Sequence, residues 1–133
     1  SAAADVYKRQ IHDMPVPKLE GVTGWLDHRL QLGAKTYPGH TGSPIDAPSK
    51  ALKAGGHGVP GGENMIRFPD GSVRYYSIRE AARIQTFPDD YALHGAWGEA
   101  MRQIGNAVPV ELARVVAKSV VEHLEKDAAD TLP

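Results

Sequence analysis

Glycine and proline interrupt the first 48 residues so often that no long helix or regular strand is expected there. Both residue types end regular periods and favour turns. A helical turn or two is expected only within residues 22–32. The interrupting residues are Pro15, Pro17, Gly21, Gly24, Gly33, Pro38, Gly39, Gly42, Pro44 and Pro48. Most regular structure must therefore form after residue 48.

The composition limits the chemistry that the chain can perform. Its 133 residues are 41% hydrophobic, the size of one domain or of part of a larger one. It has no cysteine, which excludes a disulfide framework, a cysteine-ligated metal and a cysteine nucleophile within these residues. The six histidines are scattered without ligand spacing, so no metal site is expected.

The charge and hydropathy of the whole chain point to no particular partner. Fifteen basic and sixteen acidic residues leave a net charge of -1, so only a local patch could favour nucleic acid. No apolar run approaches the roughly 20 residues that span a bilayer, and no signal peptide is visible. A protein of the cytoplasm, with no membrane partner, is expected.

Residues 49–76 suggest short strands around a glycine-rich loop. A strand is expected at 50–53, followed by the loop at 54–64. A hairpin is expected from 64–68 and 73–76, because an Asp-Gly pair between β-rich runs suits the positive φ angles of a tight turn.

The remainder of the chain has helical patterns. Ser77 and Glu80 have the spacing of a capping box, and the helix that they begin is expected to end near Thr86, before Phe87 and Pro88.

Two more helices are expected. The first covers 97–104, with Gly105 as its left-handed cap. The second covers about 110–125, with Pro109 near its first turn. It carries an apolar stripe that needs a partner surface, and the short chain is not expected to supply all of it. The stripe consists of Leu112, Ala113, Val116, Ala117, Val120, Val121 and Leu124.

Three segments could carry function, and each has a purely structural alternative. The glycine-rich loop could approach phosphate groups closely, or it could be a solvated surface loop. Residues 79–88 are best explained as scaffold. Residues 103–109 could open a helix N-terminus to an anion, or form a simple corner between helices. The basic residues that could face DNA are Lys50, Lys53, His57, Arg67 and Arg74.

Two of these segments resemble motifs of the DNA (cytosine-5)-methyltransferase family. Residues 79–88, REAARIQTFP, resemble its ninth motif, and residues 103–109, QIGNAVP, resemble its tenth. The ordered pair is highly specific. The stretch from 39–43, GHTGS, through 57–64, HGVPGGEN, is similar to a compact target-recognition region. The resemblance covers about residues 37–124.

The resemblance implies an α+β fragment of a two-domain enzyme. Short β-hairpins of a small recognition domain would be followed by helices that complete an α/β Rossmann-like domain binding S-adenosylmethionine (AdoMet). The expected division is a non-native leader at 1–10, an irregular linker at 11–36, the recognition region with motif nine at 37–95, motif ten and its helix at 96–125, and a polar tail at 126–133.

The resemblance also assigns roles. Family members transfer methyl from AdoMet to C5 of cytosine in duplex DNA, using a cysteine that lies before this region in family order, so this chain alone is expected to be inactive. Asn106 and Ala107 would contact AdoMet, and the basic residues above would contact DNA. The structural motif residues would be Arg79, Glu80, Arg83, Gln85, Gln103 and Gly105.

The partner of the apolar stripe stays open at this point. It could be a catalytic domain of the same bacterial or phage-type polypeptide, from which this chain is truncated, or a separate large subunit. A stand-alone, non-catalytic DNA-binding module is the alternative function, and such a module would have to cover the stripe itself.

Overall fold

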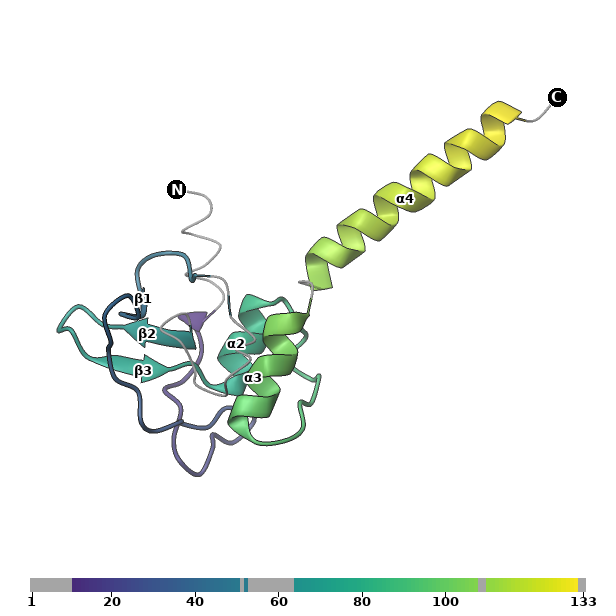
Figure 1. The fold of residues 1–133 in the computed structure, drawn as a ribbon. Coiled ribbons are helices and arrows are strands. Elements are labelled where there is room, and N and C mark those ends of the chain that lie inside the picture. The colour runs from purple at the N-terminus through teal and green to yellow at the C-terminus, as the bar shows by residue number, and fades with distance from the viewer. Residues whose placement is uncertain (1–10, 51, 53–63, 108–109, 132–133) are drawn as a thin grey trace.

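The computed structural model describes residues 11–50, 52, 64–107 and 110–131, so the expected leader at 1–10 and most of the glycine-rich loop lie outside it. Figure 1 shows a small sheet beside two helices, with the last helix extending away from both. In chain order the elements are β1 (Ser43–Pro44), β2 (Met65–Arg67), β3 (Val73–Tyr75), α2 (Ile78–Ile84), α3 (Trp97–Asn106) and α4 (Val110–Thr131).

The predicted hairpin is confirmed. Strands β2 and β3 pair antiparallel, and Gly71 in their connection has a φ of +87°. The Gly71 N–H donates to the Phe68 carbonyl at 2.9 Å, and the Phe68 N–H donates to the Ser72 carbonyl at 2.8 Å. This is a three-residue loop in which the left-handed position requires glycine. The Asp70 carboxylate accepts from the Ser72 hydroxyl and N–H, which lowers the pKa of Asp70.

The third strand of the sheet is not where the sequence placed it. Lys50 and Leu52 belong to no strand, and the other two residues of the expected strand lie outside the described part. Instead β1 pairs parallel with β2, with Ser43 opposite Ile66. The Lys50 N–H donates to the Ser43 hydroxyl at 3.0 Å, so Lys50 contacts β1 through its backbone without adding a strand.

The expectation of a helical turn in residues 22–32 is wrong. Asp27 has a left-handed φ of +56°, which no α-helix contains. The carbonyls of Leu26 and Asp27 accept hydrogen bonds from Arg79, at 2.9 Å in both cases, rather than from N–H groups one turn later. Tertiary hydrogen bonds therefore fix this loop in an irregular form.

Helix α2 begins as predicted. The Ser77 hydroxyl accepts from the Glu80 N–H at 3.1 Å, and the Glu80 carboxylate accepts from the Ser77 N–H at 2.8 Å, which confirms the capping box. The helix ends at Ile84, before the predicted end at Thr86, because Thr86 turns the backbone to a φ of +62°.

Helices α3 and α4 are both longer than predicted. Gly105 is not a left-handed cap, because α3 continues through Asn106 and ends with Ala107 in an extended conformation. The Gln85 side chain satisfies the carbonyls of Ile104 and Ala107, so this end needs no glycine turn. Helix α4 runs to Thr131, so most of the expected polar tail is helical. Pro109 lies outside the described residues.

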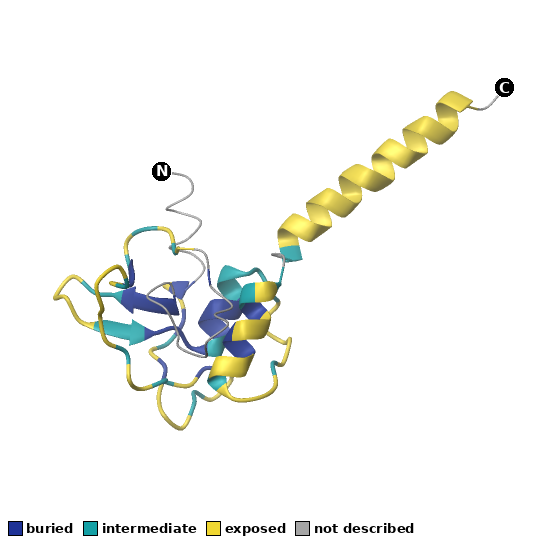
Figure 2. Cartoon of the chain, viewed as in Figure 1, coloured by how far each residue is buried: buried dark blue, intermediate teal, exposed yellow. Residues whose placement is uncertain are grey.

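The core lies between the sheet, α2 and α3 (Figure 2). Partly buried aromatic side chains, Trp25 and Trp97 among them, pack around its margin. The buried members of the core are Ile11, Met14, Leu52, Ile66, Tyr76, Ala81, Ala82, Met101 and Ile104.

Helix α4 contributes nothing to this core. It has no buried residue, and Figure 2 shows it exposed along almost its whole length. The large side chains of the apolar stripe are between 52% exposed, at Val120, and 63% exposed, at Leu124. The described remainder of the chain therefore leaves the stripe uncovered, as its sequence suggested.

Candidate functional site

Arg79 connects the segments on both sides of α2. Its side chain is completely buried. The guanidinium donates to the carbonyls of Leu26 at 2.9 Å, Pro88 at 3.0 Å and Tyr91 at 2.5 Å. It also lies 3.4 Å from the carboxylate of Asp27. One planar group with several fixed donors can hold these carbonyls at once, which a lysine could not do.

Glu80 joins the first turn of α2 to the hairpin. Besides its part in the capping box, its carboxylate accepts two hydrogen bonds from Arg74, at 2.6 and 3.1 Å. Arg74 also donates to the Tyr75 carbonyl at 3.1 Å, and its guanidinium lies 5.8 Å from the centre of the Phe68 ring. The side chain of Arg74, which the sequence predicts to contact DNA, is therefore already bonded to Glu80 within the chain.

A buried histidine completes this network. His28 Nδ1 lies 2.7 Å from the Ser77 hydroxyl, and Nε2 lies 2.6 Å from the Pro15 carbonyl. A carbonyl only accepts, so Nε2 carries a proton, and in the neutral ring Nδ1 accepts from Ser77. No local pattern in the sequence marks this role, because the partners of His28 lie in other segments.

Arg83 extends outward from α2 to two carboxylates and one indole ring. It donates to Asp89 at 2.9 and 2.7 Å and to Asp13 at 2.7 Å. Its guanidinium lies 4.9 Å from the centre of the Trp25 ring. The hydrogen bonds that Arg83 donates to Asp89 lower the pKa of Asp89 and raise the pKa of Arg83.

Residues 103–107, with the proposed AdoMet contacts, lie at the end of α3. Asn106 is exposed and Ala107 is half-buried. Gln103 is exposed, with its amide 3.5 Å from the Glu99 carboxylate. Gly105 is an interior residue of α3.

Two of the N–H groups that the sequence suggested could face an anion, at the start of α4, are bonded within the chain. The Val110 N–H donates to the Gln85 carbonyl at 3.1 Å, and the Glu111 N–H donates to the Thr86 hydroxyl at 2.8 Å. The Ala107 N–H donates to the Ile104 carbonyl. A cofactor contact here must therefore use side chains or groups beyond these three N–H donors.

The basic residues predicted to face DNA fall into three groups. Lys50 is exposed and Arg67 half-buried, and both lie along β1, where Arg67 pairs with Pro44. Arg74 is bound to Glu80, as described above. Lys53 and His57 lie outside the described residues.

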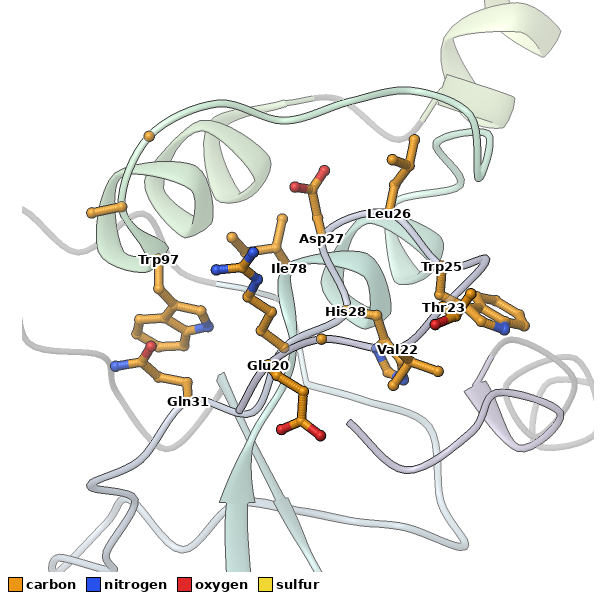
Figure 3. A pocket seen from close by; sticks show the side chains of 14 residues that line it. Glu20, Val22, Thr23, Trp25, Leu26, Asp27, His28, Gln31, Ile78 and Trp97 are labelled. Atoms are coloured by element: carbon orange, nitrogen blue, oxygen red, sulfur yellow. The ribbon is translucent and has the colours of Figure 1, made fainter. Parts of the chain in front are cut away.

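A cavity with a volume of about 710 Å³ lies around the loop that precedes α2. Figure 3 shows Trp25 and Trp97 at opposite ends of its lining, with Ile78 and Asp27 between them. None of the described residues assigned to DNA or AdoMet lines it. No motif marks this cavity in the sequence, because its walls come from an irregular loop and two helix ends.

Within the described ranges, no three histidine, aspartate or glutamate side chains lie together in a way that could hold a metal ion. None of the described helices has the length and apolar character needed to cross a membrane.

Comparison with known families decides the identity. Residues 29–122, well over half of the chain, match the family model for C-5 cytosine-specific DNA methylases. The chain belongs to this family. The match includes α2, α3 and most of α4, and with them both motifs recognised in the sequence.

Individual type II methyltransferases are also similar to the chain. The chain is 53% identical over 58 residues to the type II methyltransferase M.Sau96I of Staphylococcus aureus, covering 44% of this chain and 13% of the relative. It is 50% identical over 64 residues to M.AplI of Arthrospira platensis, covering 47% and 19%. It is 42% identical over 81 residues to M.Eco47II of Escherichia coli, covering 61% and 18%. The chain thus matches less than a fifth of the length of each relative.

Proposed function

We propose that this chain supplies the target-recognition region and the closing part of the AdoMet site of a DNA cytosine-5 methyltransferase. The enzyme would transfer methyl from AdoMet to C5 of cytosine in duplex DNA, in the cytoplasm of a bacterial or phage-type host. The 133 residues contain no cysteine, so the nucleophile of that reaction would come from a catalytic part outside them. The chain alone would be inactive.

The observation that carries this proposal is the projecting helix α4. It follows the motif-ten segment directly and presents six large apolar side chains to solvent, the five of the apolar stripe and Val115. Burying each of them would contribute roughly 1 kcal/mol or more, which favours a large partner surface. A Rossmann-like catalytic domain, in the same polypeptide or in a separate large subunit, fits this demand. A stand-alone DNA-binding module would leave the stripe uncovered.

The proposed DNA contacts and the proposed AdoMet contacts lie in different segments of the chain. Lys50 and Arg67, along β1, would contact the DNA backbone together with Lys53 and His57. Asn106 and Ala107, at the end of α3, would contact AdoMet. The Asn106 side chain is exposed at the end of α3 and is therefore accessible to a ligand.

The proposal is tested by locating and adding the catalytic part. Sequencing the native locus before Ile11 would show whether a Pro-Cys motif lies in the same frame or in a neighbouring one. The purified chain and that part together are expected to transfer labelled methyl from AdoMet to DNA, and neither is expected to do so alone. If the combination is inactive and the chain does not bind the catalytic part, the proposal is wrong.

Two variants then separate the roles. Asn106→Ala is expected to raise the KM for AdoMet without changing sequence choice, whereas Lys53→Ala is expected to weaken DNA binding and reduce its salt dependence. Arg102→Ala, an exposed change on the same helix as Asn106, is the matched control. An unchanged KM for AdoMet in Asn106→Ala would remove Asn106 from the cofactor site.

A further inference from the structure

The end of α2 is hydrogen-bonded to the junction between α3 and α4. The Gln85 amide donates to the carbonyls of Ile104 at 2.9 Å and Ala107 at 3.1 Å. Its backbone carbonyl accepts from the Val110 N–H, and the Thr86 hydroxyl accepts from the Glu111 N–H. Two consecutive residues of motif nine thus hold both the last carbonyls of α3 and the first N–H groups of α4.

This arrangement supplies an N-terminal hydrogen-bond acceptor for α4 from a distant segment. The first N–H groups of a helix have no partner within the helix, and a residue just before the helix usually supplies one. Here the acceptor for Glu111 is Thr86, 25 positions away in the sequence. Within the described residues, the two bonds to Val110 and Glu111 are the hydrogen bonds that join α4 to the body.

Thr86 adopts an unfavourable backbone conformation to make this bond. Its N–H donates to the Arg83 carbonyl, and the Phe87 N–H donates to the Ala82 carbonyl, which together form a Schellman motif. The left-handed position of that motif normally holds glycine. Thr86 occupies it with a φ of +62°, which is strained for a β-branched residue. Glycine would relieve the strain, but it would lack the hydroxyl that accepts from α4.

We propose that Thr86 and Gln85 are positioning residues that fix the direction in which α4 leaves the body. Because α4 has no buried side chain of its own, these bonds at its first turn determine its orientation. We call these hydrogen bonds from Gln85 and Thr86 the brace. The consequence for catalysis rests on the proposed function: through α2, the brace would hold the recognition region in a fixed position relative to the catalytic part that covers α4. It would fix the same region relative to the AdoMet contacts at 106–107.

Orientation can be measured in the full chain without any enzymatic assay. Because the chain has no cysteine, spin labels can be placed at Glu20→Cys on the body and Lys118→Cys on α4 with no other thiol present. Both sites are exposed. The parent protein is expected to give one narrow distance distribution. Thr86→Val, which keeps the branched side chain but loses the acceptor, is expected to broaden it at least twofold.

Two further variants separate orientation from stability. Thr86→Ser keeps the hydroxyl and is expected to retain the narrow distribution. Thr86→Gly is expected to raise the thermal midpoint by relieving strain, and yet to broaden the distribution as Thr86→Val does. If Thr86 acted only through stability, the thermal midpoint and the distance distribution would change together, and a more stable variant would also have the narrower distribution. Thr131→Val, which removes a hydroxyl at the far end of α4, is the matched control. An unchanged distribution in both Thr86→Val and Thr86→Gly would overturn the proposal.

The reconstituted enzyme provides the second arm. Thr86→Val is expected to lower kcat by about fivefold, the equivalent of one hydrogen bond, while the affinity of the chain for DNA stays unchanged, and Thr86→Ser is expected to restore kcat. If the spin-label result holds and no methyl transfer can be reconstituted, the brace stands and the proposed function fails. If methyl transfer occurs and Thr86→Val matches the parent in kcat and in distance distribution, the brace is wrong.

Discussion

Arg79→Met is the change that most directly tests how the body is held together. Methionine keeps much of the apolar stem of the side chain and removes the guanidinium. The lost donors leave the carbonyls of Leu26, Pro88 and Tyr91 without their partner, in a site where Arg79 itself is fully buried. The loop before α2 and the segment after it would both be released.

The expected loss follows from the number and kind of bonds. A hydrogen bond to a charged group contributes about 1.5–3 kcal/mol, and removing one partner of a buried charged pair costs about 3–5 kcal/mol. The Asp27 side chain is 26% exposed, so water would compensate part of its loss. We therefore expect Arg79→Met to lower the free energy of unfolding by about 3–5 kcal/mol, a large share of the 5–15 kcal/mol typical of a domain.

Urea unfolding followed by tryptophan fluorescence is the appropriate assay. Trp25 precedes Leu26 and therefore reports on the loop that Arg79 holds, whereas Trp97 packs against the core and reports on its unfolding. Arg102→Met is the control, because Arg102 is 51% exposed in a surface pair with Glu99 and should contribute little to stability. A loss in Arg79→Met within 1 kcal/mol of that control, by the same extrapolation, would refute the reasoning.

Three further changes test a helix cap, an ion pair and a left-handed turn position. Ser77→Ala is expected to lower stability by about 2 kcal/mol in thermal unfolding, because it removes both the cap of α2 and the hydroxyl that lies 2.7 Å from His28 Nδ1. Asp89→Asn is expected to be less stable than the parent above the ordinary carboxyl pKa of 3.8. That difference should vanish as the pH falls through the lowered pKa of Asp89, because the protonated group no longer binds Arg83. Gly71→Ala is expected to cost about 1 kcal/mol, because its φ of +87° strains any side chain.

Each of these changes has a control or a contrary outcome. Gly98→Ala lies inside α3 with open space around the added methyl group, so it should stabilise by about 0.5–1 kcal/mol. A Ser77→Ala loss below 0.5 kcal/mol would show that the cap and the histidine contact contribute little. A difference between Asp89→Asn and the parent that persists unchanged at low pH would mean that it does not arise from the carboxylate.

Features that depend on neighbours in the sequence could be predicted from it. The capping box of Ser77 and Glu80 and the hairpin around Gly71 are local, because a side chain bonds a backbone group three residues away or a turn requires a positive φ. The apolar stripe of α4 is equally readable, because a helix repeats every 3.6 residues whether or not its partner is present. The two ordered motifs led to the correct family for the same reason.

Features that depend on distant partners were decided only by the tertiary structure. Residues 22–32 are irregular because Arg79 takes the carbonyls that a helix would use, and Gly105 stays helical because the Gln85 amide satisfies the end of α3. The buried position of His28 and the capping of α4 by Thr86 likewise join segments far apart in the chain. A backbone carbonyl or N–H accepts whichever partner the fold brings nearest, and no local pattern in the sequence records that choice.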